Sequence, residues 1–230
     1  MPKAKQQQSE RLISSADLFW QQAKAALSGL PNGGLNIAHE AVDRHAVGDY
    51  RHHVAIRCID STGISQDFSY LDLSKLTNQF AHVLQQLQVV TGDCVFTLLG
   101  RVPELYITVL GTLKNGSIVC PLFSVFGPEP IRTRLVSGNA KVLVTSKRLY
   151  EDKIEPLRRS LPGLKHIIIV DQDQDIPPFC DDFWQLINRA SDRFTISPTK
   201  PETPALLHFT SGTTGKPKGV LHVHNAVVAH

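Results

Sequence analysis

Ten residues near the end of the sequence, TSGTTGKPKG (210–219), combine the kinds of side chain that bind phosphate. Three glycines allow backbone conformations that are closed to other residues and bring N–H groups close to an anion. Hydroxyl groups donate hydrogen bonds to phosphate oxygens, and two lysines add charge-assisted contacts to a polyphosphate. Pro217 stiffens the run between the lysines. The run therefore predicts a loop that holds the phosphates of a nucleotide.

Eight residues of this run are expected to contact phosphate: Thr210, Ser211, Gly212, Thr213, Thr214, Gly215, Lys216 and Lys218. Lys218 follows a proline, so a solvent-facing side chain is the alternative for it. A plain flexible connector is the alternative for the whole run, but the run follows an apolar strand and carries a proline between its lysines. It is not a Walker loop, because G-x-x-x-x-G-K-[ST] would require glycine at position 210 and serine or threonine at position 217.

The residues before this run alternate between apolar strands and helices. Apolar runs of strand length predict four buried strands, at 94–100, 117–123, 141–146 and 166–171. Helical spacing with proline or glycine boundaries predicts helices at 71–88, 103–116, 128–136 and 147–160. Such strands separated by helices are typical of βαβ units, so the sequence predicts an α/β fold with a mainly parallel sheet and flanking helices.

Smaller elements are predicted on either side of this pattern. One helix is expected from a cap at Ser15 towards Gly29, another from a cap at Asn36 to Ala46, and a short one at 183–190. Two β-rich runs, at 54–60 and 64–70, are joined by a Ser-Thr-Gly turn and predict a hairpin.

The composition narrows the classes of partner. The 230 residues are 42% hydrophobic and 20% charged with a formal net charge of +3, as in ordinary globular proteins. The lysines and arginines are spread along the chain, which argues against nucleic acid and a membrane surface as partners. No run reaches the roughly 20 apolar residues of a membrane span. The first residues lack the apolar core of a secretory signal.

Four cysteines stand far apart in the sequence, without a CxxC pair or a histidine at metal-ligand spacing. They are Cys58, Cys94, Cys120 and Cys180. A free cysteine embedded in an apolar run behaves as a small hydrophobe. We therefore expect structural thiols, no metal site among them, and a reducing, cytoplasmic location.

The loop at 210–219 resembles the phosphate-loop signature of the adenylate-forming superfamily, which comprises acyl-CoA synthetases, luciferases and peptide-synthetase adenylation domains. Phe209 stands where many members carry tyrosine. Four upstream segments also resemble superfamily elements: FSYLDL (68–73), VTGDCV (90–95), RVPELY (101–106) and LKNGSIVCPLF (113–123). Cys94 replaces a common arginine and Asn115 a small residue.

A second resemblance points to one branch of this superfamily. Leu35-Asn36 followed by Asp43-Arg44-His45 resembles the L-N…D-R-H element of acetyl-CoA synthetase types, and LFSVFGPEP (122–130) fits the same branch. We interpret the element as a marker of the branch. A local surface pairing of Asp43, Arg44 and His45 is the alternative for its physical role.

The resemblance implies a reaction in two halves. A short-chain carboxylate attacks the α-phosphorus of ATP to give acyl-AMP and pyrophosphate, and the thiol of CoA then displaces AMP. The implied ligands are the carboxylate, ATP, CoA and Mg²⁺ bridging phosphate oxygens, with the loop on the β- and γ-phosphates. His222 and His224 follow the loop and face one side if the backbone is extended. The resemblance places His224 near the acyl group as a catalytic candidate, with a polar helix start as the alternative.

The superfamily's later elements, which bind adenine, ribose and Mg²⁺ and carry the catalytic lysine, have no counterpart here. We therefore expect residues 1–230 to be a partial N-terminal AMP-binding domain, with 1–14 disordered, that is inactive alone. Two alternatives remain: an adenylation domain of another carboxylate-activating enzyme, and a stand-alone nucleotide-binding module. The sequence predicts neither the oligomeric state nor which short acid is used, acetate being only the branch's suggestion.

Overall fold

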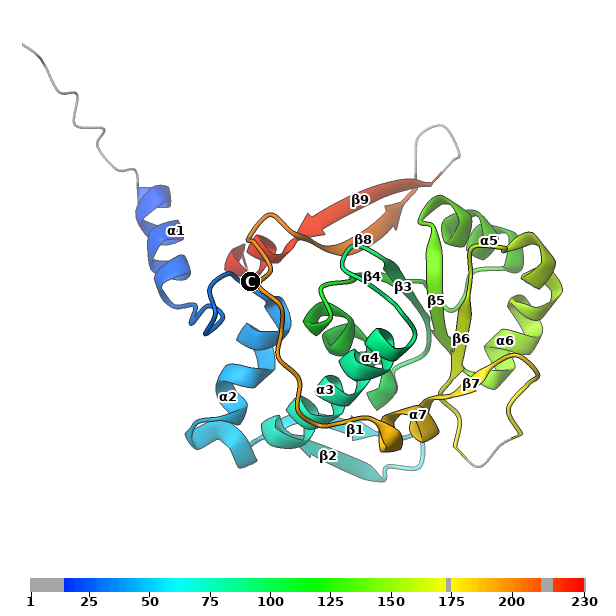
Figure 1. Cartoon of the computed structure of the whole chain (residues 1–230), viewed down its shortest axis with the longest axis horizontal. Coiled ribbons are helices and arrows are strands. Elements are labelled where there is room, and N and C mark those ends of the chain that lie inside the picture. Colours follow the sequence, from blue (N-terminus) through cyan, green and yellow to red (C-terminus); the bar gives the residue numbers. More distant parts are fainter. Residues whose placement is uncertain (1–14, 173–174, 212–216, 230) are drawn as a thin grey trace, which may run out of the picture.

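The computed structural model describes residues 15–172, 175–211 and 217–229, and its centre is a sheet with the order β7-β6-β5-β3-β4-β8-β9 (Figure 1). The strands are β3 (Cys94–Leu98), β4 (Ile118–Pro121), β5 (Ala140–Thr145), β6 (His166–Ile169), β7 (Asp181–Asp182), β8 (Pro204–Thr210) and β9 (Lys218–Val223). Neighbouring strands pair in parallel except β8 and β9, which are antiparallel. The predicted α/β fold with a mainly parallel sheet is confirmed.

Alternate residues of the central strands point to opposite faces of the sheet, and each face has its own apolar core. In β5, Val142 and Val144 join one core and Leu143 joins the other. The first core is covered by α3 (Tyr70–Gln86), α4 (Pro103–Lys114) and α7 (Phe183–Arg189). The second is covered by α5 (Pro128–Ser137), α6 (Lys147–Lys153) and the 3₁₀ turn η3 (Glu155–Ser160) on the other side of the sheet (Figure 1). Burial on both faces explains why these strands are continuously apolar.

Local signals set where the helices begin and end. The Ser69 hydroxyl accepts the amide of Asp72, and the Asp72 carboxylate accepts the amide of Ser69, which together form a capping box at the start of α3. Proline occupies the first turn of α4 and α5. The single helix predicted at 147–160 is wrong, because α6 ends at Lys153 and η3 follows. Pro156 has no N–H to continue the α-helical ladder there.

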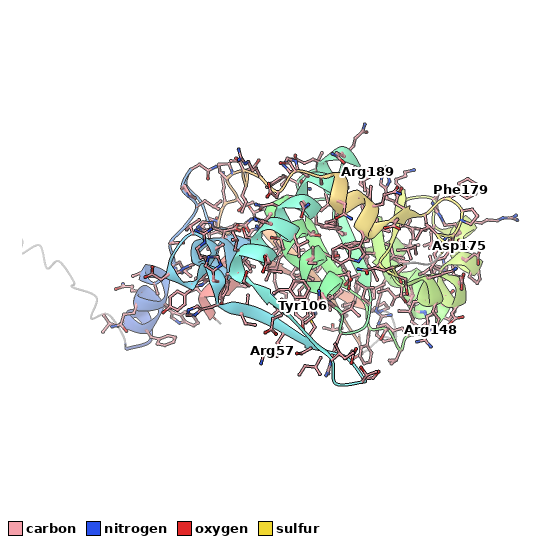
Figure 2. All side chains as sticks on the ribbon, turned by 90° about the horizontal axis from the view of Figure 1, so that it is seen from below. Arg57, Tyr106, Arg148, Asp175, Phe179 and Arg189 are labelled. Carbon is pink, nitrogen blue, oxygen red and sulfur yellow. The ribbon has the colours of Figure 1, made fainter. Side chains whose placement is uncertain are left out.

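The smaller elements surround the sheet. The predicted hairpin is present as β1 (Val54–Ile59) and β2 (Ser65–Ser69), joined across its exposed face by an ion pair of 2.7 Å between Arg57 and Asp67. Figure 2 shows Arg57 at the outside of the molecule. The other helical elements are α1 (Ser15–Ala25), the π-helical turn η1 (His39–Asp43), α2 (Arg44–Ala46), and the 3₁₀ turns η2 (Asp49–His52) and η4 (His224–Ala229).

The crossing of α3 and α4 depends on a glycine. A Cβ atom added to Gly111 of α4 would lie 2.8 Å from both the Cβ atom of Phe80 and the carbonyl oxygen of Thr77 in α3. Both neighbours belong to a helix packed in the core, so neither can move freely.

We expect Gly111→Ala to lower the free energy of unfolding by about 1–3 kcal/mol, the usual cost of overpacking. The higher helix propensity of alanine would by itself raise the free energy of unfolding by about 1 kcal/mol. A measured decrease is therefore due to the steric contact. Chemical denaturation measures it, with Gly48→Ala as control because an added Cβ meets no atom within 4 Å there. A variant as stable as the parent would show that the two helices separate without cost.

Candidate nucleotide site

The predicted phosphate loop connects the two strands of a hairpin. In the register of β8 and β9, Thr210 lies opposite Lys218. Thr210 and Lys218, which flank the loop, therefore lie side by side at the end of β8 and the beginning of β9 (Figure 1). Part of the predicted contact set lies outside the residues that the structure describes, and its contacts stay predictions: Gly212, Thr213, Thr214, Gly215 and Lys216.

The two ends of the loop are accessible to a ligand. Thr210, Ser211 and Lys218 are exposed, and Pro217 is half-buried. The Thr210 hydroxyl donates a long hydrogen bond of 3.5 Å to the Lys218 carbonyl oxygen across the hairpin. The Ser211 hydroxyl and the Lys218 ammonium group are donors at this end of the hairpin, and the Thr210 hydroxyl becomes a third if it gives up its long bond, which suits an anion. Contact with phosphate stays a prediction for all three.

The two faces of the hairpin differ. Leu207 and Phe209 of β8 pack against the core beneath α5. The opposite face borders a hollow of about 600 Å³ whose walls are mainly apolar. Its lining is Ile37, Leu206, His208, Thr210, Val220, His222, Ala226 and Val227.

Two imidazoles meet on this face, and the sequence pattern singled out only one of them. The ring centroids of His208 and His222 are 5.9 Å apart at an angle of 83°. Partial burial and the neighbouring His222 lower the pKa of His208 below its ordinary value. The sequence would have pointed to His208 only if the register of β8 against β9 were known, because that register places it near His222. A strand followed by a loop does not reveal the register.

His224 is placed differently from His222. Because β9 ends at Val223 and His224 begins η4, the backbone is not extended there and the two rings do not share a side. His224 is completely buried, whereas His222 is exposed. Its Nδ1 accepts the backbone N–H of Ile37 at 3.1 Å, so the proton of the neutral ring lies on Nε2. Burial lowers the pKa of His224 to about 4. Its catalytic role stays a prediction.

The L-N…D-R-H element forms buried contacts. Asn36 donates through Nδ2 to the carbonyl oxygen of Leu113, at 2.8 Å. Asp43 pairs with the fully buried ammonium group of Lys114 at 2.6 Å, and Arg44 pairs separately with Glu40 at 2.7 Å. The alternative of a local surface pairing among residues 43–45 is therefore wrong. Through Asn36 and Asp43 the element is hydrogen-bonded to the end of α4.

The cysteines are free thiols: Cys58, Cys94, Cys120 and Cys180. Burial raises the pKa of each thiol above its ordinary value, which disfavours the nucleophilic thiolate. Within the described ranges, no group of three or more His, Cys, Asp or Glu side chains is arranged to hold a metal ion. Across the same residues, no helix has the length and apolar character needed to span a membrane.

Comparison with known proteins decides the family. Residues 43–230 match the sequence profile of the family described as AMP-binding enzyme. The chain belongs to the AMP-binding enzyme family. The resemblance to adenylate-forming enzymes is thereby confirmed.

Curated relatives of this AMP-binding chain include acetyl-CoA synthetases. That of Bacillus subtilis is 35% identical over 210 residues, which are 91% of this chain and 36% of the relative. That of Methanothrix thermoacetophila is 34% identical over 205 residues, which are 84% of this chain and 31% of the relative. The chain thus spans about a third of the length of the relatives it matches.

Solved structures agree on the fold of the AMP-binding chain. An acyl-CoA synthetase of Brucella canis superposes with a TM-score of 0.80 at 28% identity, covering 91% of this chain and 37% of that one. An anthranilate CoA ligase in complex with anthranoyl-AMP has a TM-score of 0.73 at 23% identity, covering 82% and 35%. The second likeness supports the fold alone.

The described part of the AMP-binding chain fits some ligands of its family better than others. The exposed hydroxyls of Thr210 and Ser211 and the ammonium group of Lys218 suit a polyphosphate. For Mg²⁺, which prefers oxygen ligands, these hydroxyls are suitable neighbours, but no acidic cluster accompanies them in the described ranges. We predict no contact between CoA and the described side chains.

We expect His224 to make stability depend on pH. Its pKa is lowered from 6.5 to about 4 in the folded protein, so the unfolded chain binds the extra proton first as pH falls. The contribution is fully present above pH 6.5 and is lost towards pH 4, which amounts to roughly 2–3 kcal/mol between pH 7 and pH 4.5. Urea unfolding across this range measures it.

The variant His224→Asn keeps an acceptor for the Ile37 amide but does not titrate. Between pH 7 and pH 4.5 the unfolding free energy of the parent should therefore fall by roughly 2–3 kcal/mol more than that of the variant. A difference that is constant from pH 7 to pH 4.5 would contradict a neutral, buried ring.

Proposed function

We propose that this chain is the N-terminal part of an ATP-dependent acid–thiol ligase of the acetyl-CoA synthetase type. The observation that carries the proposal is the β8–β9 hairpin with hydroxyl and ammonium groups at its open end, in a chain that aligns with the acetyl-CoA synthetase of Bacillus subtilis over 91% of its length. The substrates would be a short-chain carboxylate, ATP and CoA. Residues 1–230 alone would not complete the reaction.

The proposed reaction has two balanced steps. A carboxylate oxygen forms a bond to the α-phosphorus of ATP, and the bond from that phosphorus to the β-bridging oxygen breaks, giving acyl-AMP and pyrophosphate. The sulfur of CoA then bonds to the acyl carbon, AMP leaves, and the thiol proton passes to solvent or a base. Adenylation is needed because a free carboxylate is a poor electrophile for a thiol.

The loop would contribute by positioning the nucleotide and neutralising its charge. Negative charge grows on the departing pyrophosphate, so donors already aimed at the β- and γ-phosphates stabilise the transition state. Thr210 and Lys218 would flank these phosphates from the two strands, with the residues between them, Lys216 included, closing around the oxygens. Mg²⁺ would supply further charge neutralisation at the phosphate oxygens.

The identity of the carboxylate substrate and the cellular location of the protein are proposed on separate grounds. The names of the relatives in Bacillus subtilis and Methanothrix thermoacetophila favour acetate as the substrate. The free thiols support a reducing compartment, and we place the protein in the cytoplasm on that basis. An adenylation domain for an aromatic acid is the second candidate, which acid-dependent exchange of pyrophosphate into ATP would distinguish.

We expect Lys216→Ala in the full-length protein to reduce acetate-dependent ATP–pyrophosphate exchange by about 10²-fold or more. The reason is the loss of a charge-assisted contact that strengthens as charge develops on the phosphates. The control is Lys75→Ala, which removes an exposed lysine of α3 far from the loop in sequence.

Exchange that is as fast in Lys216→Ala as in the parent would remove the phosphate role of the loop. Exchange that depends on an aromatic acid but not on acetate would favour the second candidate instead.

A further inference from the structure

Three polar side chains are buried together at the base of the β8–β9 hairpin, far from its loop end. Asn36 and His224 have no solvent exposure, and Thr199 is 4% exposed. They come from three separate parts of the sequence: the L-N element, the segment before β8 and the turn after β9. We call this set the hairpin clamp.

The first contacts of the clamp join the L-N element to the segment before β8. The amide of Leu35 donates to the carbonyl oxygen of Thr199 at 2.8 Å, and the Thr199 hydroxyl donates back to the Leu35 carbonyl oxygen at 2.7 Å. A Cβ atom on Gly34, whose φ is +99°, would lie 2.4 Å from the Thr199 carbonyl oxygen. The two backbones therefore touch directly, and only glycine permits the approach.

The second contacts join the same element to the end of β9. The amide of Ile37 donates to His224 Nδ1 at 3.1 Å. The amide of His224 donates to the Thr203 carbonyl oxygen at 3.0 Å, and the amide of Asn225 to that of Pro201 at 2.8 Å. The segment before β8 and the turn after β9 are thus bound to each other, and both are bound to residues 35–37.

The third contacts fix the clamp to the packed core. Asn36 Nδ2 donates to the Leu113 carbonyl oxygen at 2.8 Å and lies 3.3 Å from the Thr199 hydroxyl oxygen, while Asn36 Oδ1 accepts the amide of Ala38 at 3.0 Å. Leu113 belongs to α4, which packs on α3 and the sheet. Because Asn36 is buried, water cannot replace a bond that is lost.

The clamp affects the position of the loop, because a small rotation at the base of the hairpin displaces its loop end by a larger distance. β8 has seven residues, so its end lies about 20 Å from its base at roughly 3.3 Å per residue. A rotation of about 3° at the base would shift the loop by about 1 Å, and a misplacement of that size can cost about 10²-fold in rate. β8 pairs with β4 near the base, where Leu206 lies opposite Val119, and further along one face of β8 packs against the core through Leu207 and Phe209.

We propose that Asn36, Thr199 and His224 are positioning residues, which hold the base of the β8–β9 hairpin so that its loop meets the phosphates of ATP. The inference rests on the proposed function. It gives the L-N element a physical role. In this role His224 would act through the Ile37 amide and η4, and not by contact with the reacting atoms.

The decisive comparison is His224→Asn against His224→Leu in the full-length protein. The Asn amide oxygen can take the place of Nδ1 as acceptor, whereas leucine leaves the Ile37 amide without one. We expect leucine to raise the KM for ATP in pyrophosphate exchange by about tenfold or more, and asparagine to leave it within about threefold. The exposed His53→Leu is the matched control.

Amide hydrogen exchange supplies the readout that is independent of catalysis. In His224→Leu, the amide of Ile37 and those of residues 218–223 should exchange at least about tenfold faster, under conditions where the protein stays folded. In His224→Asn their rates should match the parent. If His224→Leu does not fold, Thr199→Val, which removes a hydroxyl at nearly constant volume, is compared with Thr199→Ser in the same two assays.

The outcomes separate the clamp from the proposed function. An unchanged KM for ATP in a folded His224→Leu protein overturns the inference, and so does an asparagine variant as impaired as leucine, since the ring itself would then be required. If the parent shows no exchange with any short acid, the proposed function fails. The clamp is then judged from hydrogen exchange alone, where equal rates in parent and leucine variant would refute it.

Discussion

The antiparallel pairing of β8 with β9 is the constraint on which the candidate site depends. Parallel strands must be joined by long crossovers, whereas an antiparallel pair can present a compact loop at one end. With Thr210 opposite Lys218, the two ends of the loop are held about 5 Å apart. Glycines and hydroxyls between them can then converge on one anion. The same residues on an unpaired segment would spread over many conformations.

The rest of the fold supplies a rigid support for this hairpin. Two apolar cores hold the sheet from both sides, and β8 enters beside β4 in parallel. A buried polar network connects residues 36–43 to α4, which packs on the sheet. In it, burial lowers the pKa of Lys114, while Asp43 at 2.6 Å opposes the shift and stabilises the ammonium group. Removing one partner of such a pair leaves the other uncompensated.

Local patterns in the sequence predicted most elements but not the contacts between them. Apolar runs, capping residues and prolines such as Pro103 set the strands and helices, and the phosphate-loop signature identified the family. The hairpin register was not accessible, because it depends on pairing between two segments and not on the apolar pattern within either one. For the same reason the burial of His224 and the bond from Asn36 to Thr199, 163 residues apart, left no local signal.

The most direct test of this account is a crystal structure of the full-length protein with a non-hydrolysable ATP analogue. The account predicts that oxygens of the β- and γ-phosphates lie within hydrogen-bond distance, about 2.7–3.2 Å, of donors between Thr210 and Lys218. It also predicts an unbroken bond from Ile37 to His224 at the base of the hairpin. A nucleotide bound elsewhere, with residues 210–218 facing only solvent, would contradict it.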